Sequence, residues 1–187
     1  MKITLWNKKG GVGKTNLSYN IARDLKFFLL SNDDSVIEIA YPNKAKITNN
    51  FKILDNCVYD LGGFVDVSAN TVLKNSDIIL IPTFYDLNAL RRTQSTISDI
   101  QKLQCKATII IIANNLPNNT YHKELLKIKE TFNSFKVLPI PNSKIFSNAM
   151  KKKTSILEIG KTKLNAYRYR KVLSDYKNLL KTIIKDK

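Results

Sequence analysis

The stretch KKGGVGKT at residues 8–15 decides the expected fold of this chain of 187 residues. Three of the six glycines of the chain lie here within four consecutive positions, directly after an apolar run and directly before a helical pattern. Glycines let consecutive backbone N–H groups point inward around an anion, and the amino end of the next helix adds a favourable dipole. The stretch therefore predicts a phosphate-binding loop between a strand and a helix, with Lys14 as a mobile positive charge.

The spacing inside this loop excludes two common glycine-rich patterns. The dinucleotide fingerprint GxGxxG fails because Asn16 stands where its last glycine belongs. The strict GxxxxGK[ST] pattern fails by one residue, since its first glycine would fall at Lys8. What remains, KGGxGKT over residues 9–15, resembles the deviant Walker A loop of the ParA/MinD family of partition and positioning ATPases.

The resemblance implies a role for each residue of the loop. The residues expected to surround the phosphates of ATP are Gly10, Gly11, Val12, Gly13, Lys14, Thr15 and Asn16. The Thr15 hydroxyl would bind Mg²⁺. In the family, a lysine at the place of Lys9 reaches across a dimer interface to the partner's nucleotide. Lys9 and Lys14 are therefore the two lysines expected to take part in catalysis.

Three further segments extend the resemblance along the chain. VYDLGG at residues 58–63 is similar to the Walker B segment, an apolar strand that ends in Asp60, whose carboxylate would hold Mg²⁺ directly or through water and act in catalysis. SDIILIP at residues 76–82 is similar to the strand that lies near the interface side of the nucleotide. Asn114 and Pro141 stand where the family contacts adenine, through an amide side chain and a loop after the last strand.

The second strand departs from the family pattern. We expect this strand at residues 36–40, within VIEIAYPN at residues 36–43. Family members usually end it with Asp-x-Asp-Pro-Gln, and the second Asp positions or activates the attacking water. That carboxylate is missing here in either alignment, although Glu38 stands one position away. We therefore expect ATP binding to survive, and ATP hydrolysis to be slow or dependent on a partner.

Apolar runs of about 4–8 residues alternate with longer helical patterns, which indicates repeated βαβ units. Strands are expected at residues 3–6, 36–40, 57–59, 78–81, 108–113 and 137–140, and helices at residues 14–30, 67–74, 87–103, 121–132, 144–150 and 163–185. We expect one domain, residues 1–187, with a doubly wound, mainly parallel sheet covered by helices on both faces. The resemblance implies the SIMIBI type of P-loop NTPase. Gly and Pro residues cluster beyond the carboxyl ends of the strands, the edge where such sheets bind ligands.

Composition excludes several other classes of protein. No apolar stretch approaches the roughly 20 residues of a membrane span. The chain starts with Lys2 and a strand-like run instead of a secretory signal, so we expect a cytoplasmic protein. His122 is the only histidine, which excludes Ser-His-Asp catalysis and multi-histidine zinc sites. Cys57 and Cys105 lack metal-ligand spacing and are expected to be buried thiols.

The charge points to a polyanionic partner. The formal net charge is +16, and residues 144–187 hold thirteen Lys and Arg against three acids. This basic helical region therefore carries ten of the sixteen excess charges, and such a surface attracts nucleic acid. The residues expected to contact DNA are Lys151, Lys152, Lys153, Arg168, Arg170 and Lys171.

The end of the chain has a competing interpretation. Leu173, Tyr176, Leu179, Leu180, Ile183 and Ile184 recur at helical spacing with lysines on the other faces. This pattern fits a membrane-surface helix like the one that ends MinD-type proteins. It also fits a terminal helix that packs on the sheet, which we expect because its Tyr and its continuity with the preceding residues suit packing.

The resemblance implies an ATP-dependent switch. We expect an ATPase whose ATP state is a homodimer that binds DNA without sequence preference, associated with the nucleoid and serving plasmid or chromosome partition. A centromere-binding adaptor protein is the expected partner. Three alternatives remain open: an accessory protein of conjugative DNA transfer, a MinD-like positioning ATPase at the membrane, and a nucleotide-dependent binding module with almost no turnover.

Overall fold

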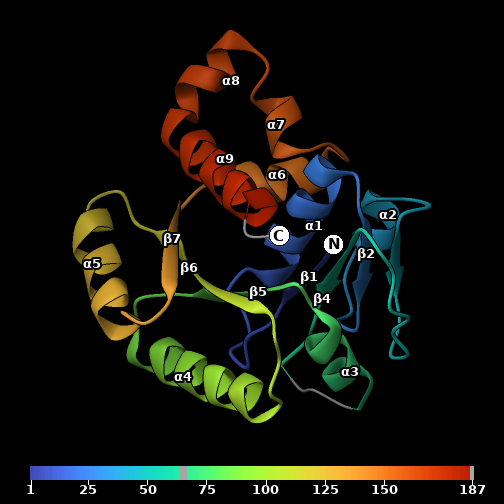
Figure 1. The fold of residues 1–187 in the computed structure, drawn as a ribbon. Coiled ribbons are helices and arrows are strands. Elements are labelled where there is room, and N and C mark those ends of the chain that lie inside the picture. Colours follow the sequence, from blue (N-terminus) through green and yellow to red (C-terminus); the bar gives the residue numbers. More distant parts are fainter. Residues whose placement is uncertain (64–66, 186–187) are drawn as a thin grey trace.

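The computed structural model describes residues 1–63 and 67–185 (Figure 1). Within these residues, seven parallel strands form one sheet in the order β3-β2-β4-β1-β5-β6-β7. The strands are β1 (Lys2–Leu5), β2 (Phe28–Ser31), β3 (Ala45–Ile47), β4 (Cys57–Asp60), β5 (Ile78–Thr83), β6 (Thr108–Leu116) and β7 (Lys136–Pro141). The predicted doubly wound α/β sheet is confirmed.

Helices cover both faces of the sheet (Figure 1). One face is covered by α1 (Lys14–Leu25), α2 (Ile37–Ala40), α6 (Ile145–Lys151), α7 (Ile156–Ile159) and α9 (Arg170–Lys185). The other face is covered by α3 (Val67–Asn75), α4 (Leu87–Lys102) and α5 (Tyr121–Thr131). The short helix α8 (Lys163–Arg168) has no buried residue and projects from the first of these layers.

Burial on both faces explains why the central strands are apolar without alternation. All six residues of β5 are buried, and its side chains alternate between the two hydrophobic clusters, with Ile78 and Leu80 in one and Ile79 and Ile81 in the other. A strand covered on both sides has no face toward solvent, so its sequence does not alternate between apolar and polar residues. The pairing of Leu5 with Asp60, and of Asp60 with Ser31, brings the ends of β1, β4 and β2 together at one edge.

The prediction of a strand at residues 36–40 is wrong. Ile37–Ala40 forms the one-turn helix α2, in which Ile37 and Ala40 are buried while Val36 and Ile39 are exposed. The segment was predicted as a strand because it is a short apolar run, but burial at i and i+3 follows a helical turn. The strand that pairs with β4 is instead β2, which lay inside the helix predicted for residues 14–30.

Strand β2 was not predicted because helix α1 ends in an unusual way. Helix α1 stops at Leu25 because Lys26 takes the left-handed conformation with φ of 61°, and its N–H donates to the carbonyls of Ala22 and Arg23. That position normally carries Gly, which signals the end of a helix. With Lys there, the apolar residues 27–30 looked like one more helical turn. Strand β3 and helix α7 were also not predicted, and Tyr169 divides the expected terminal helix into α8 and α9.

Helix α9 packs on the body of the protein, as expected. Leu173, Tyr176, Leu179 and Ile183 are buried in the cluster that also contains α1 and α6. The Tyr176 hydroxyl donates to Asp24 Oδ2 at 2.9 Å, which ties α9 to α1. The apolar stripe is therefore covered inside the molecule except at Ile184, which is exposed. Among residues 1–63 and 67–185, no helix is both long and apolar enough to cross a bilayer.

Candidate functional site

The glycine-rich loop joins β1 to α1 at the carboxyl edge of the sheet. Gly11 and Gly13 have φ of 75° and 87°, a region that side chains other than glycine rarely adopt. A Cβ added at Gly10 or Gly11 would meet no atom within 4 Å, so the space above the loop is open. A Cβ at Gly13 would lie 2.5 Å from Asn114 Nδ2. The loop therefore has the conformation and the room that an anion cradle needs.

Asn7 anchors the start of this loop, a role that sequence reasoning missed. Its side chain is buried, and Nδ2 donates to Pro82 O and to Thr93 Oγ1, both at 2.8 Å. Its Oδ1 accepts from the Lys9 N–H at 2.9 Å. These bonds tie the loop to β5 and α4. The signal in the sequence was an amide residue placed directly after an apolar strand.

Lys14 brings a positive charge into a buried position beside the loop. The residue is 5% exposed, and its ammonium donates to the Asn7 carbonyl oxygen at 3.3 Å. Burial lowers the pKa of Lys14, while the carboxylates of Asp60 and Asp33 act in the opposite direction. A charge removed from water attracts an anion more strongly than a solvated one. Lys14 thus lies buried beside the glycine loop, and its contact with a phosphate stays a prediction.

Asp60 ends β4 as a completely buried carboxylate. Its Oδ1 accepts from Ser18 Oγ at 3.2 Å, and its Oδ2 accepts from Ser31 Oγ at 3.3 Å. Burial raises the pKa of Asp60, whereas the Thr15 hydroxyl, Lys14 and Ser18 lower it. Sequence reasoning found Asp60 and Thr15 but not the two serines that orient the carboxylate.

The donors at this position suit Mg²⁺. Over the described residues, no group of three or more His, Cys, Asp and Glu side chains surrounds a metal position. Mg²⁺ needs no such group, because it is commonly held by one or two protein oxygens together with water and substrate phosphates. The hydroxyl of Thr15 and the carboxylate of Asp60, beside an open phosphate loop, are such a pair of oxygen ligands.

A second carboxylate follows the true second strand. Strand β2 ends at Ser31, and the N–H of Asp33, two residues on, donates to Ser31 Oγ at 3.0 Å. Asp33 lies close enough to affect the pKa of both Lys14 and Asp60. The expectation that this strand lacks its second acid depended on placing the strand at residues 36–40, and the structure places it at Phe28–Ser31 instead.

Glu38 does not take the place of that acid. Its Oε1 accepts from the Ile47 N–H at 2.9 Å, so the carboxylate is engaged at the edge strand β3. The sequence did carry a signal for acids at the end of β2. Asn32, Asp33 and Asp34 follow an apolar run and Ser31, as expected at the carboxyl end of a buried strand.

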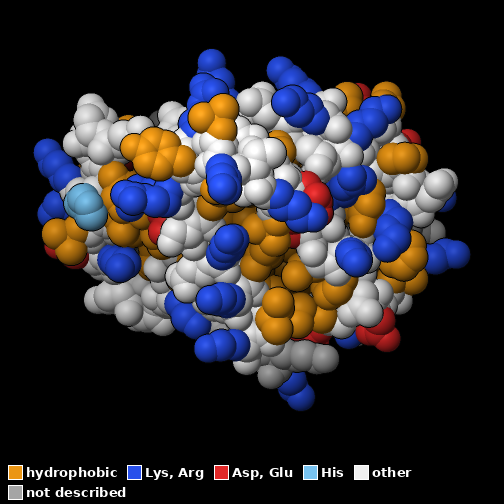
Figure 2. Space-filling view, turned by 90° about the horizontal axis from the view of Figure 1, so that it is seen from above, with side chains coloured by type: hydrophobic (Ala, Val, Ile, Leu, Met, Phe, Trp, Pro, Cys, Tyr) orange, Lys and Arg blue, Asp and Glu red, His pale blue; other side chains and the backbone are white. Residues whose placement is uncertain are grey.

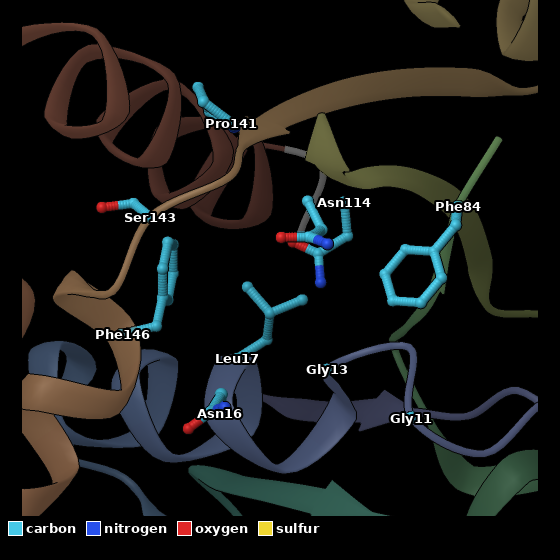
Figure 3. A pocket seen from close by; sticks show the side chains of 10 residues that line it. Gly11, Gly13, Asn16, Leu17, Phe84, Asn114, Pro141, Ser143 and Phe146 are labelled. Atoms are coloured by element: carbon cyan, nitrogen blue, oxygen red, sulfur yellow. The ribbon is translucent and has the colours of Figure 1, made fainter. Parts of the chain in front are cut away.

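A cavity of about 210 Å³ opens beside the loop (Figure 3). It is lined by Gly11, Gly13, Asn16, Leu17, Phe84, Asn114, Asn115, Pro141, Ser143 and Phe146. Asn114 Nδ2 donates to Val12 O at 2.8 Å, which joins the end of β6 to the loop. The predicted adenine-side residues Asn114 and Pro141 thus meet the glycine loop here. The aromatic rings of Phe84 and Phe146 flank opposite sides of this cavity and were not predicted.

Lys9 lies apart from this cavity. It lines a different hollow of about 490 Å³, together with Lys8, Gly10, Gly63 and Arg92. Lys8 is held within the chain, because its ammonium lies 2.5 Å from Asp99 Oδ2 and donates to Ser95 Oγ at 3.0 Å. The structure therefore separates the two predicted catalytic lysines, with Lys14 inside the site and Lys9 on the outer side of the loop.

The six residues predicted to contact DNA are exposed in the carboxyl-terminal layer. Lys151 ends α6, and Lys152 and Lys153 follow it. Arg168, Arg170 and Lys171 surround the junction of α8 and α9. Figure 2 looks onto this side of the molecule and shows Lys and Arg spread over the face with few acids between them. Lys171 also has internal contacts, since its ammonium lies 3.7 Å from the Tyr121 ring centroid and 3.9 Å from Asp175 Oδ2.

No protein-family model and no curated protein matches this sequence. Solved structures match most of the chain. Apo McdA from Cyanothece superposes with a TM-score of 0.71 at 12% identity, over 94% of this chain and 99% of that chain. A Borrelia burgdorferi B31 protein described as a plasmid partition protein, bound to AMPPNP, gives 0.66 at 18% identity, over 95% and 98%.

A third match is MinD of Pyrococcus horikoshii OT3 complexed with Mg-ADP, with a TM-score of 0.64 at 12% identity, over 84% of this chain and 87% of that chain. The chain has the fold of the ParA and MinD ATPases. In this ParA/MinD fold, the glycine-rich loop, Lys14 and Asp60 meet at the carboxyl edge of the sheet, where the ligands of open α/β sheets bind.

Proposed function

We propose that this chain is a ParA/MinD-type ATPase that binds ATP with Mg²⁺ and uses it to form a homodimer that binds DNA in plasmid or chromosome partition. One observation carries the proposal: a buried lysine and a buried aspartate lie together beneath an open glycine loop. Both charges are costly to bury unless a ligand completes the site. The nucleotide complexes of the Borrelia protein and of the Pyrococcus MinD support the assignment.

Different residues of the site would contact the phosphates, the Mg²⁺ ion and the base of the nucleotide. Backbone N–H groups of residues 10–15 and the Lys14 ammonium would hold the phosphates. Thr15 and Asp60 would hold Mg²⁺, which supplies neutralisation of charge on the phosphates. The cavity between Phe84 and Phe146, with Asn114 and Pro141 on its wall, would take the base.

Asp33 is the residue that we propose to orient the water for hydrolysis. It stands two residues past β2, and its charge acts on both Lys14 and Asp60. Phosphoryl transfer needs a side chain that positions the attacking water, and a carboxylate at the edge of the phosphate site meets that need. The position of Asp33 removes the original reason to expect slow ATP hydrolysis.

The face that carries Lys9 is the proposed dimer interface. Tyr85, in the connection that follows β5, and Leu87, the first residue of α4, are 40% and 87% exposed. Exposed apolar side chains of this kind are covered when a partner binds. A second copy would place its Lys9 against the nucleotide of the first. This geometry agrees with the position of Lys9 outside its own nucleotide cavity.

The basic carboxyl-terminal layer is the proposed DNA surface. A backbone phosphate needs only a Lys or Arg within reach, and a dimer would present two such layers. A nucleoid-associated location and a centromere-binding adaptor are part of this proposal. An accessory role in conjugative transfer would use the same surface. The MinD-like membrane alternative is disfavoured because the apolar residues of α9, apart from Ile184, are buried.

Size-exclusion chromatography with ADP, ATP and a slowly hydrolysed ATP analogue tests the proposal. We expect the dimer only with ATP or the analogue, and we expect Lys9→Ala to remain monomeric while it still binds nucleotide. Lys129→Ala, which removes an exposed lysine of α5, is the matched control and should dimerise normally. A monomer in every nucleotide state would contradict the dimer, and equal behaviour of the two variants would contradict the role of Lys9.

A further inference from the structure

A second cavity, of about 320 Å³, adjoins the nucleotide cavity. Its lining residues are Asn118, Pro141, Asn142, Ser143, Arg168, Tyr169, Lys171 and Val172. Pro141 and Ser143 line both cavities, so the segment between β7 and α6 is their common wall. We call this second space the basic cavity. It lies between the loop that precedes α5 and the junction of α8 and α9.

The side chains of the basic cavity suit a phosphate group. Arg168 and Lys171 are positive, Asn118 and Asn142 supply amide N–H donors, and no described acid is part of the lining. Arg168 is exposed, with its guanidinium 5.5 Å from the Tyr169 ring centroid. A guanidinium donates two parallel hydrogen bonds to phosphate oxygens, and neighbouring amides complete the set.

The common wall is rigidly attached to both sides. The Asn142 N–H donates to Leu116 O at 2.8 Å, which fixes the segment to the end of β6. Ser143 Oγ accepts from the Ile145 N–H at 3.2 Å at the start of α6. The next residue of that helix, Phe146, lines the nucleotide cavity. If a ligand in one of the two cavities displaces residues 141–143, the shape of the other cavity therefore changes as well.

We propose that the basic cavity binds one phosphate of the DNA backbone and that residues 141–143 couple its occupancy to that of the nucleotide cavity. This inference rests on the proposed ATP and DNA binding. A DNA phosphate is favoured over a free anion because the cavity opens among exposed cations of the same layer, such as Lys163 and Arg170. Only a polymer engages several of these at once, and each contact adds to affinity.

Coupling of this kind is reciprocal. If nucleotide tightens DNA binding by some factor, then DNA tightens nucleotide binding by the same factor. Such factors are typically about 5–150-fold. The structure places the coupling in three consecutive residues, so variants of the basic cavity are expected to reduce the factor. Loss of a cation elsewhere on the surface is expected to weaken DNA binding without changing the coupling factor.

The test compares Arg168→Ala and Asn142→Ala with the control Lys163→Ala. Lys163 is an exposed cation of the same short helix as Arg168 but does not line the basic cavity. Fluorescence anisotropy would give the affinity for a labelled duplex with and without the slowly hydrolysed ATP analogue. Titration of a fluorescent nucleotide would give its affinity with and without the duplex. The coupling factor is read from both measurements.

We expect a coupling factor of at least about 5 in the wild type and in Lys163→Ala. It should be several-fold lower in Arg168→Ala and Asn142→Ala, which keep only the part of the coupling that comes from dimerisation, and Arg168→Ala should also lower the slope of log affinity against log salt by about one. The same fall in DNA affinity for Arg168→Ala and Lys163→Ala, with coupling intact in both, would overturn the inference.

Two further outcomes separate this inference from the proposed function. A wild-type protein that binds nucleotide but no duplex would contradict the DNA surface and the inference together. Coupling to inorganic phosphate alone, without duplex, would show a free-anion site and overturn the assignment to DNA. A wild type that binds both ligands with no effect of Arg168→Ala would overturn the inference and leave the proposed function standing.

Discussion

At the scale of single residues, the site consists of charges that are unfavourable without a ligand. Asp60 is fully buried, and burial raises its pKa despite the help of Thr15, Lys14 and Ser18. Lys14 is nearly buried, and burial lowers its pKa. The two shifts have the same cause and opposite sign, because desolvation disfavours whichever form is charged. Under the proposed function, a phosphate and a cation would compensate these two buried charges.

The first prediction concerns Asp60→Asn. An amide of the same shape removes a buried carboxylate, so we expect the ligand-free variant to gain about 1 kcal/mol in free energy of unfolding, or about 2–4 °C in Tm. The gain should grow with pH above about 4. There the unfolded carboxyl loses its proton before the native one does, so the wild-type free energy of unfolding falls. Thermal melts across pH measure this, and Mg²⁺-dependent nucleotide binding should be lost. A less stable ligand-free variant would contradict the account.

The second prediction concerns Gly13. Its φ of 87° and a Cβ position 2.5 Å from Asn114 Nδ2 make Gly13→Ala strained in two ways, with an expected loss of about 1–3 kcal/mol in stability. Gly10→Ala is the control, since its Cβ meets no atom within 4 Å. Urea denaturation of both variants is the measurement. Equal stabilities would show that the loop is more adaptable than described.

The third prediction concerns Asp33. Asp33→Asn should lower the rate of ATP hydrolysis by about 10²–10⁴-fold, the usual contribution of a residue that orients or activates water, with little change in nucleotide affinity. Asp34→Asn and Glu38→Gln are the controls, because Asp34 is its exposed neighbour and Glu38 is bound to the Ile47 N–H. Steady-state phosphate release measures all three. Full activity in Asp33→Asn would refute this role.

At the scale of elements, the sequence was sufficient to predict a strand or helix wherever its local pattern agrees with its burial in the folded protein. Strands β1, β4, β5, β6 and β7 are apolar runs followed by Gly or Pro, and all five were predicted. The glycine loop, Asp60, Asn114 and Pro141 were singled out for the same reason, since each lies at or beyond the end of such a run, and their roles toward a nucleotide stay predictions.

The missed elements are those whose local pattern is misleading. Lys26 ends α1 without glycine, and α2 imitates a strand while only Ile37 and Ala40 are buried. One wrong strand then hid Asp33, because its place in the site depends on which segment pairs with β4. Asn7 and the rings of Phe84 and Phe146 were missed because their roles come from distant partners that the sequence does not pair.

The fourth prediction concerns the attachment of α9. The Tyr176 hydroxyl is buried and donates to Asp24 Oδ2 at 2.9 Å. Tyr176→Phe leaves a largely buried carboxyl short of a donor, so we expect a loss of about 1–3 kcal/mol in free energy of unfolding. Tyr167→Phe is the control, since Tyr167 is 81% exposed on α8. Similar melting curves for the two variants would show that α9 is held by its apolar contacts alone.

At the scale of the whole molecule, the sheet divides the chain into two functional layers. The edge that carries the glycine loop, Lys9 and the exposed Leu87 would face a second copy. The layer of α6, α8 and α9 carries most of the excess charge and would face DNA. The segment at residues 141–143 lies between the nucleotide cavity and the basic cavity, so one short connection belongs to both functions.

Isothermal titration calorimetry of the full chain with a slowly hydrolysed ATP analogue tests the central claim most directly, with and without Mg²⁺. We predict saturable binding of one nucleotide per chain that is much tighter with Mg²⁺ and is lost in Lys14→Ala. A saturating Mg²⁺ titration that shows no binding heat at several temperatures would contradict the nucleotide site, and with it the dimer and the coupling that depend on it.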